Sequence, residues 1–495
     1  MLSFLQLESL DFKSVLLFFV VFLFIADYLK HRKPPNYPPG PFQWPFAGNV
    51  FSIDSKQPDV YMRKLAEVYG DIFSLRLGHE ETVVATGYKM VKEALVGQAE
   101  IFVDRPYSPM GERMYPDNAG LFFSNGMKWK THRRFAMTTL RNFGLGKTLM
   151  ENAICEEIRY LQEEMETQKG DPFNPKMLFN NAVSNIICQL VYGRRYDYSD
   201  YTFQKVLKKF NEALYLEGTI WAQLYEAFPV IMKHLPGPHN AIFSNYLDVA
   251  DFIRKEVERH KEDLDPNNPR DYIDAYITEM QSGSGNDDFT ESNLVMNSLD
   301  LFLAGTETTS TTLLWALVLL IKHPDVQKKV QSEIDTVIGQ SRPPSMADKA
   351  SMPYTEAVIH EIQRIGNIVP INGLRLAGKD TTLGGYFIPK GTSLLTNLTS
   401  VMFDKTEWET PEEFNPGHFL DSEGKFRRRD AFLPFSAGKR VCLGEQLARM
   451  ELFLFFVGLL QKFSFSTEEG VELSLEGEVG ATRTPLPFKV FTHTR

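Results

Sequence analysis

Cysteine is scarce in this chain, which contains only three cysteines among its 495 residues. Cys155, Cys188 and Cys442 cannot form a disulfide framework, and three thiols are too few for an all-cysteine iron–sulfur cluster. The sequence also lacks the CxxC and HExxH spacings that are typical of zinc sites. These absences exclude the usual zinc proteins and indicate a reducing compartment.

An excess of positive charge is also absent. The chain has 53 basic and 63 acidic side chains, a formal net charge of −10, which argues against a nucleic-acid partner. The interior contains no biased stretch long enough to separate two cores, while 43% hydrophobic residues and 38 phenylalanines allow one sizeable core. We therefore predict a single large domain over residues 42–495.

The N-terminal segment is apolar. Residues 15–26 form an unbroken apolar run, which is shorter than the roughly 20 residues of a full membrane crossing, so a cleaved signal peptide is the alternative. The basic residues 30–33 follow this run, and Glu8 and Asp11 precede it, which is the reverse of the order in a signal peptide. We expect residues 1–33 to be an uncleaved membrane anchor with a basic stop, and the rest of the chain to be cytoplasmic.

The next segment, residues 34–41, contains five prolines. It cannot be helical, and we expect a stiff, extended hinge between the anchor and the body. A polyproline ligand for a partner domain is the competing interpretation, but the position directly after the anchor favours a hinge.

Periodicity in the body predicts a mainly α fold with small β-sheets. A short helix is expected over residues 61–69, paired strands over 72–77 and 82–86, and helices through 149–277 with breaks near Pro229 and Pro236. The apolar residues 228–232 are predicted to be either core or a loop that rests on a membrane. Asn397 begins a glycosylation sequon, which a cytoplasmic location would leave unused.

The richest stretch is residues 435–444, FSAGKRVCLG. Cys442 is predicted to be a thiolate ligand of haem iron: Gly438 allows a tight turn, Gly444 lets backbone approach a cofactor, and Phe435 can shield the sulfur. Arg440 can reach a haem propionate. An amphipathic helix from 445 to 460 would place its N-terminal dipole beside the thiolate. The alternative is a buried structural cysteine.

A second unusual stretch interrupts a long apolar helix that is predicted from about Glu291 to His323. Ala304 and Gly305 would leave space for a ligand, and Thr308 could hold a water that delivers protons for oxygen chemistry, with Glu307 beside it. Threonines that bond the carbonyls of an ordinary packed helix are the alternative.

Four ordered motifs together resemble those of the cytochrome P450 family: WxxxR at 129–133, AGxETT at 304–309, ExxR at 361–364, and the cysteine stretch. The resemblance covers the whole chain and is greatest to animal family-two microsomal P450s, nearest the arachidonic-acid epoxygenase branch, over 105–147 and 432–456. It implies a metal ligand at Cys442 and catalytic roles for Thr308 and Glu307. It also implies an ion pair of Glu361 and Arg364, completed by His418 where many members have arginine, and pocket positions at Phe123, Ala304 and Ile371. The implied haem contacts are Arg105, Trp129, Arg133, Arg375, Arg440, Phe435, Gly438 and Gly444.

This resemblance implies the cytochrome P450 fold with an N-terminal transmembrane anchor, and a haem-thiolate monooxygenase. Haem b would be the cofactor, and NADPH would act indirectly through NADPH–cytochrome P450 reductase on a basic face with Lys128, Lys130 and Arg134, with cytochrome b5 as a further partner. O2 and a lipophilic substrate would be the reactants. The enzyme would be held at the membrane of the endoplasmic reticulum by its anchor, which membrane lipid would surround. Fatty acid, arachidonic acid, steroid and xenobiotic substrates remain open.

Two other functions fit the same residues. A P450-fold peroxide isomerase or dehydratase would need no reductase, and Thr308 with the basic residues argues against it. A non-enzymatic haem sensor would not need the polar interruption in the long helix.

Overall fold

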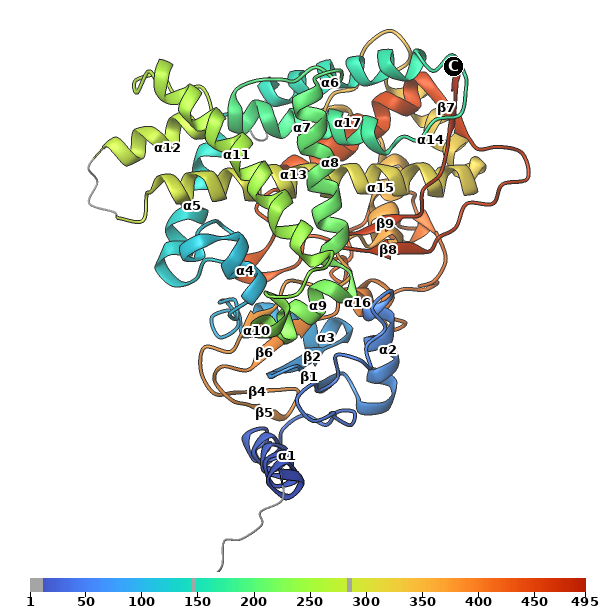
Figure 1. Cartoon of the computed structure of the whole chain (residues 1–495). Coiled ribbons are helices and arrows are strands. Elements are labelled where there is room, and N and C mark those ends of the chain that lie inside the picture. The colour runs from blue at the N-terminus through green and yellow to red at the C-terminus, as the bar shows by residue number, and fades with distance from the viewer. Residues whose placement is uncertain (1–11, 145–147, 283–286) are drawn as a thin grey trace, which may run out of the picture.

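The computed structural model describes residues 12–144, 148–282 and 287–495. It is mainly helical with small sheets, as predicted, and Figure 1 shows most helices gathered in the upper part, above the largest sheet. The longer helices are α1 (Phe12–Lys30), α2 (Pro58–Tyr69), α5 (Gly126–Asn142), α6 (Thr148–Glu166), α7 (Lys176–Tyr192), α8 (Tyr201–Glu217), α9 (Ile220–Ala227), α11 (His239–Asp263), α12 (Tyr272–Gln281), α13 (Glu291–Lys322), α14 (Pro324–Val337), α15 (Pro353–Gly366) and α17 (Glu445–Lys462); the short ones are α3 (Gly87–Lys92), α4 (Pro109–Met114), α10 (Pro229–Met232) and α16 (Thr399–Met402).

The largest sheet has the strand order β1-β2-β6-β3. The strands β1 (Ile72–Leu77) and β2 (Glu80–Ala85) pair antiparallel as the sequence predicts, and β2 pairs parallel with β6 (Ser393–Thr396). The other strands are β3 (Arg375–Leu376), β4 (Thr381–Leu383), β5 (Tyr386–Ile388), β7 (Phe463–Ser466), β8 (Gly477–Val479), β9 (Arg483–Pro485) and β10 (Phe491–Thr494). The hairpin of β8 and β9 lies against α13.

The helix α13 forms the centre of the main core and packs most closely against α7. It begins where Thr290 accepts a hydrogen bond from the backbone N–H of Asn293, and it ends before Pro324, as the sequence predicts. Among the described residues α13 is the one helix long and apolar enough to cross a membrane, but 78% of that stretch is buried inside the protein. It is therefore an interior helix that carries the unusual polar interruption.

The helix α17 differs from the prediction. The sequence favoured an amphipathic helix after Cys442, but α17 is buried on all sides from Met450 to Gln461. The reason is that α6, α13 and α14 all pack against it, so no side of this stretch faces solvent. The loop that carries Cys442 is thereby attached to the middle of the core.

The proline segment lies along the sheet. Residues 34–41 contain no helix or strand, in agreement with the prediction. However, the backbone N–H of Ser74 in β1 donates to the carbonyl of Pro39 at 2.7 Å, and the hydroxyl of Ser74 donates to the carbonyl of Pro38 at 2.9 Å. The segment is therefore bonded to the body and is not a free connector.

A fully buried ion pair joins α15 to the segment before the cysteine loop. The guanidinium of Arg364 donates to both oxygens of Glu361, at 2.7 and 2.8 Å, and to the carbonyls of Met402, Pro411 and Glu413. His418 lies 3.2 Å from Glu361, at the third position that the sequence predicts. Because neither charge touches solvent, the pair differs from the exposed ion pairs that contribute little to stability.

We expect Glu361→Gln to lower the free energy of unfolding by about 3 kcal/mol, because it leaves the buried guanidinium of Arg364 without its counter-charge. The matched control is Glu423→Gln, the same change in an exposed pair with Lys425, which should cost less than about 0.5 kcal/mol. Denaturant unfolding followed by circular dichroism measures both, and equal losses would contradict the interpretation.

Candidate haem site

The cysteine loop has the tight turn that the sequence predicts. Gly438 has φ +77°, and a Cβ there would lie 1.8 Å from the carbonyl oxygen of Leu95, so only glycine fits. The backbone N–H of Cys442 donates to the carbonyl of Phe435 at 3.0 Å and closes the loop. Gly444 has an ordinary φ of −87° and precedes α17 directly.

The thiol of Cys442 lies in surroundings that can moderate a negative charge. Burial raises the pKa of this thiol, and the backbone N–H groups of Gly444 and Glu445 together with Arg133 act in the opposite direction. Protein atoms crowd the thiol, yet the residue as a whole keeps an open side, from which a ligand can approach. This is the donor set expected for a metal-bound thiolate at the start of a helix.

Four guanidinium groups converge near this loop. Burial and mutual repulsion lower the pKa of Arg375 to about 10 and that of Arg440 to about 9, and they also lower the pKa of Arg105. Arg133 repels Arg375 and Arg440, and it donates to the carbonyl of Val441 at 2.5 Å. An anion bound among these positive charges would compensate their repulsion.

The buried donors of Arg375 identify where that partner would bind. Its Nε and one terminal nitrogen are buried and have no hydrogen-bond partner among the described residues. Orphaned guanidinium donors of this kind are rare in folded proteins, because each costs free energy. The two carboxylates of haem b fit this cluster, so the residues present suit the cofactor.

Arg440, Arg105 and Trp129 lie close to the same cluster. Arg440 donates to the carbonyls of Val103 and Ser124, and its guanidinium lies 3.9 Å from the ring centre of Trp129. Arg105 donates to the carbonyl of Leu374 at 2.7 Å. The structure thus brings together every predicted propionate contact, although several of these donors already bond backbone carbonyls.

Along α13, one side differs from the rest. Between Asn293 and Leu320, the residues that are not fully buried are Asp300, Ala304, Gly305 and Thr308. Asp300, Ala304 and Thr308 are spaced by four and share one face. The hydroxyl of Thr308 donates to the carbonyl of Ala304 at 2.8 Å. This accessible face is where a ligand can meet the interior helix.

Two predictions about this helix need correction. Gly305 was expected to leave space for a ligand, but a Cβ there would lie 3.0 Å from the side chain of Ile187, so this glycine allows α7 to pack closely. Glu307 was expected beside Thr308, but its side chain is turned away and accepts hydrogen bonds from Thr311 and Thr482. Neighbouring residues on a helix point about 100° apart, and the contact with Thr482 selects this direction.

Asp300 is a residue that the sequence reasoning missed. Its carboxylate accepts hydrogen bonds from the hydroxyl of Tyr115 at 2.8 Å and from the backbone N–H groups of Leu121 at 2.6 Å and Phe122 at 3.0 Å. Burial raises the pKa of Asp300 to about 6. It ties the loop that leads to Phe123 onto α13, and its spacing of four from Ala304 was the signal for this role.

The two other predicted pocket residues lie on different elements. The ring of Phe123 is 5.1 Å from that of Tyr115. Ile371 forms a β-bridge with Asn397 and packs against the small apolar cluster of the large sheet. Asn397 is fully buried and donates to the carbonyl of Asp59, so its sequon is inaccessible in the folded protein.

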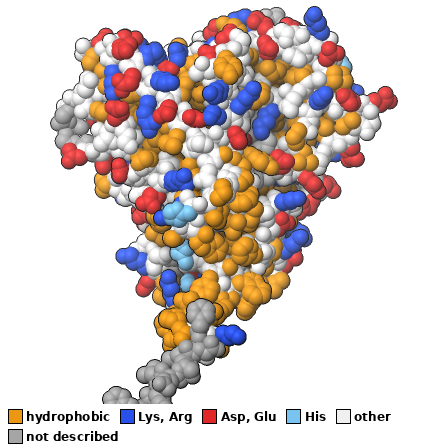
Figure 2. Space-filling view, in the orientation of Figure 1, with side chains coloured by type: hydrophobic (Ala, Val, Ile, Leu, Met, Phe, Trp, Pro, Cys, Tyr) orange, Lys and Arg blue, Asp and Glu red, His pale blue; other side chains and the backbone are white. Residues whose placement is uncertain are grey.

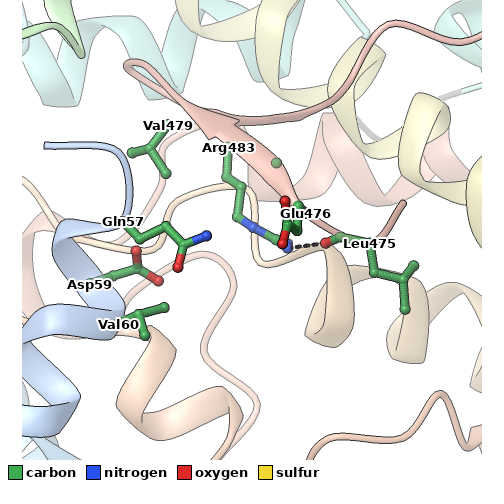
Figure 3. A pocket seen from close by; sticks show the side chains of 8 residues that line it. Gln57, Asp59, Val60, Leu475, Glu476, Val479 and Arg483 are labelled. Carbon is green, nitrogen blue, oxygen red and sulfur yellow. Dashed lines mark hydrogen bonds between the residues drawn. The ribbon is translucent and has the colours of Figure 1, made fainter. Parts of the chain in front are cut away.

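A surface pocket of about 290 Å³ lies elsewhere, between the start of α2 and the β8–β9 hairpin (Figure 3). Asp59 and Val60 form one wall, and Val479 and Arg483 form the other. None of the predicted haem or oxygen residues lines it. This pocket is separate from the candidate haem site.

Comparison with known proteins decides the family. The sequence model of the cytochrome P450 family matches residues 38–491. The chain belongs to the cytochrome P450 family. It is 50% identical to cytochrome P450 2J2 of Homo sapiens over 97% of this chain and 95% of that protein. It is 49% identical to cytochrome P450 2J1 of Oryctolagus cuniculus over the same shares, and 46% identical to cytochrome P450 2C14 of that species over 86% of this chain and 87% of the relative.

These relatives confirm the predicted resemblance to animal family-two P450s. This P450 is a haem-thiolate monooxygenase: it binds haem b and inserts one oxygen atom from O2 into a lipophilic substrate, with electrons that come from NADPH through a reductase. The isomerase, dehydratase and sensor alternatives are not favoured by these relatives.

In this P450 a second buried carboxyl group, which the motifs did not reveal, joins the cysteine helix to α13. The hydroxyl of Thr309 donates to Oε2 of Glu451 on α17 at 2.8 Å. Burial raises the pKa of Glu451 to about 8. At neutral pH the group therefore carries its proton, and it fixes α17 beside the Thr308 region.

We expect the stability of this P450 to depend on the protonation of Glu451. The folded-state pKa lies above the ordinary value of 4.5, so the folded state holds a proton that the unfolded chain has lost. The free energy of unfolding should therefore fall as pH rises from about 5 to about 8, by up to about 1.4 kcal/mol per pH unit from this group. Glu451→Gln should remove this part of the slope in urea unfolding, and parallel curves for the two proteins would contradict it.

Proposed function

We propose that Cys442 is the axial ligand of the haem iron, and that Arg105, Arg133, Arg375 and Arg440 neutralise the propionates with Trp129 beside them. The unpaired buried donors of Arg375 carry this proposal, since they need an anion that the described residues do not supply. Phe435 would shield the sulfur, and it is itself covered by the guanidinium of Arg449 at 4.9 Å. The Gly438 turn and Gly444 position the loop.

The residues around the haem would have separate roles in the reaction. When bound, haem supplies the redox chemistry that activates O2, and the Cys442 thiolate donates electron density to it. The Thr308 hydroxyl already donates its hydrogen to the carbonyl of Ala304, so its lone pairs remain free to accept from a water. Thr308 would hold that water as a proton source, while Ala304 and Phe123 border the substrate and Asp300 keeps the Phe123 loop on α13.

The redox partner would bind the surface over α5. Lys130 and Arg134 are exposed on this helix, and Arg133 connects it to the cysteine loop through Val441. Lys128 is less available, since its ammonium donates to the carbonyl of Asp117. An acidic face of NADPH–cytochrome P450 reductase fits this basic surface, and cytochrome b5 could use the same one.

For the substrate, we propose a long, unsaturated fatty acid, with arachidonic acid as the first compound to test for epoxidation or hydroxylation. The support is the similarity of residues 105–147 and 432–456 to the epoxygenase branch of the family. Ile371 would border the far part of the chain of such a substrate.

The axial ligand is tested by the absorption spectrum of the reduced, carbon-monoxide-bound protein. The wild type should show the red-shifted Soret band of a thiolate-ligated haem, and Cys442→Ala should lose it because no sulfur reaches the iron. Cys188→Ala is the matched control, since this cysteine is buried within α7. A band that survives in Cys442→Ala would refute the assignment.

We further propose three parts: an anchor at 1–33 that crosses the membrane of the endoplasmic reticulum, a cytoplasmic catalytic body at 42–495, and between them the proline-rich segment 34–41, which was predicted as a hinge and which its bonds to Ser74 hold against the body. Residues 1–11 lie outside the described residues. From Leu16 to Ile25 the large apolar side chains of α1 are exposed, as expected of a helix that lies in lipid. Figure 1 shows α1 at the lower end of the molecule.

A second apolar surface lies near this end. Figure 2 shows hydrophobic side chains gathered over the lower part of the molecule, above α1. Val230 and Ile231 on α10 are 72% and 60% exposed, and Trp44 is 57% exposed. The core alternative for residues 228–232 therefore holds for Met232, which is buried, and for Phe228, which is partly buried and packs against the main core. We propose that this surface dips into the bilayer that α1 crosses.

The joint between α1 and the body is an ion pair. The carboxylate of Asp27 lies 3.1 Å from the guanidinium of Arg76 in β1, and it accepts a hydrogen bond from the backbone N–H of Phe46. The ring centres of Phe24 and Phe46 are 5.5 Å apart. These contacts would hold the anchor at a fixed angle to the body.

This joint predicts a charge-swap result. With cysteines at 24 and 46, disulfide formation in membranes should be several-fold slower in Asp27→Arg and in Arg76→Asp, because like charges would then repel across the joint. The double swap should restore the wild-type rate. The control is Lys425→Glu, a charge reversal at an exposed residue outside the joint, which should leave the rate unchanged. Equal rates in all variants would exclude a fixed joint.

A further inference from the structure

Thr482, which precedes β9, contacts the polar interruption of α13. Its hydroxyl donates to Oε1 of Glu307 at 2.9 Å, and the hydroxyl of Thr311 donates to the same oxygen at 3.2 Å. The other oxygen, Oε2, is buried and has no partner among the described residues. Because Oε1 accepts two hydrogen bonds and Oε2 accepts none from the described residues, the two oxygens of this carboxyl group differ in their tendency to carry a proton.

The hairpin holds Thr482 in place from both sides. The backbone N–H of Ala481 donates to the carbonyl of Leu214 at 3.1 Å, and that of Arg483 donates to the carbonyl of Ile368 at 2.8 Å. The indole of Trp315 on α13 donates to the carbonyl of Arg483 at 2.9 Å. Thr482 is therefore fixed against α13 by bonds that do not involve Glu307.

The charged groups around Glu307 are few. Burial raises the pKa of Glu307, and Lys176 at the start of α7 acts in the opposite direction, as do the two threonines. On the hairpin, the guanidinium of Arg483 is turned to the carbonyls of Ile365 and Gly366, and on α17 Glu451 is bonded to Thr309. Hydroxyl donors from Thr482 and Thr311 are thus the direct contacts of the carboxyl group.

We propose that Thr482 is a positioning residue for oxygen activation: by donating to Oε1 it places the proton of Glu307 on Oε2 and keeps the carboxyl group on the side of α13 away from Thr308. The protonated group then holds its hydrogen at one defined atom. Exchange of this proton with water on the Thr308 side requires the bond to Thr482 to break. The proposal rests on the proton-delivery role proposed for Thr308.

Thr482→Val removes a donor that favours the ionised carboxylate. A hydrogen bond of this kind stabilises the ionised carboxylate. Without it, Glu307 should lose its proton at a pH about one unit higher. Thr482→Ser keeps the hydroxyl and should behave as the wild type. Thr336→Val is the matched control, because it makes the same change at an exposed threonine on α14 whose hydroxyl donates to the carbonyl of Ser332 in its own helix.

The first measurement is the pH profile of hydrogen peroxide released per NADPH consumed, with the full-length holoenzyme and reductase. We expect the midpoint to move upward by about one pH unit in Thr482→Val, and to stay unchanged in Thr482→Ser and Thr336→Val. In a Glu307→Gln background, Thr482→Val should cause no further shift. A shift that persists in that background, or no shift in Thr482→Val, would overturn the proposal.

The second measurement needs no turnover and separates this proposal from that for Thr308. The free energy of unfolding of the holoenzyme is measured against pH for the same variants. The pH range over which Glu307 changes this free energy should move upward in Thr482→Val and in none of the other variants. If this shift appears but the peroxide profile does not change, the contact is correct and the role of Thr308 is wrong; if unfolding shows no shift, the contact itself is refuted.

Discussion

A cluster of buried positive charge is the constraint on which the haem-facing half of this structure depends. Arg105, Arg133, Arg375 and Arg440 come from the loop after α3, from α5, from β3 and from the cysteine loop, and they repel one another. Backbone carbonyls accept some of their donors, and an anion bound among them would compensate the remaining repulsion. Binding of haem therefore contributes to the stability of the fold itself, because the ligand favours the assembled state.

The sequence was most informative where chemistry restricts the residue type. The turn at Gly438, the helix after Cys442 and the ends of α13 could all be predicted, because each needs particular residues at fixed local spacing. The pairing of Glu361 with Arg364 could be predicted in the same way, but not its burial. The helix ends and the β1–β2 pair were likewise local patterns. Local spacing, however, gives no information about which distant element covers a side chain.

The errors have this cause. Gly305 is small because α7 packs on it, and Glu307 turns toward Thr482, which lies 175 residues away, so neither could be read from the helix alone. The helix α17 was predicted to be amphipathic, yet three helices surround it. Asp300 was overlooked because a single acidic residue in a helix has no motif, although it organises the loop above the haem site.

The ion pair between Asp27 and Arg76 has a consequence for shortened, soluble forms of this enzyme. A chain that starts at the proline segment keeps Arg76, whose side chain is only 3% exposed, but loses the carboxylate that neutralises it. The guanidinium then keeps its hydrogen bond to the carbonyl of Trp44 and the attraction of Glu81, which lies opposite it on β2. Truncation thus removes part of the support of the first sheet as well as the contact with lipid, because an ion pair to its first strand is lost.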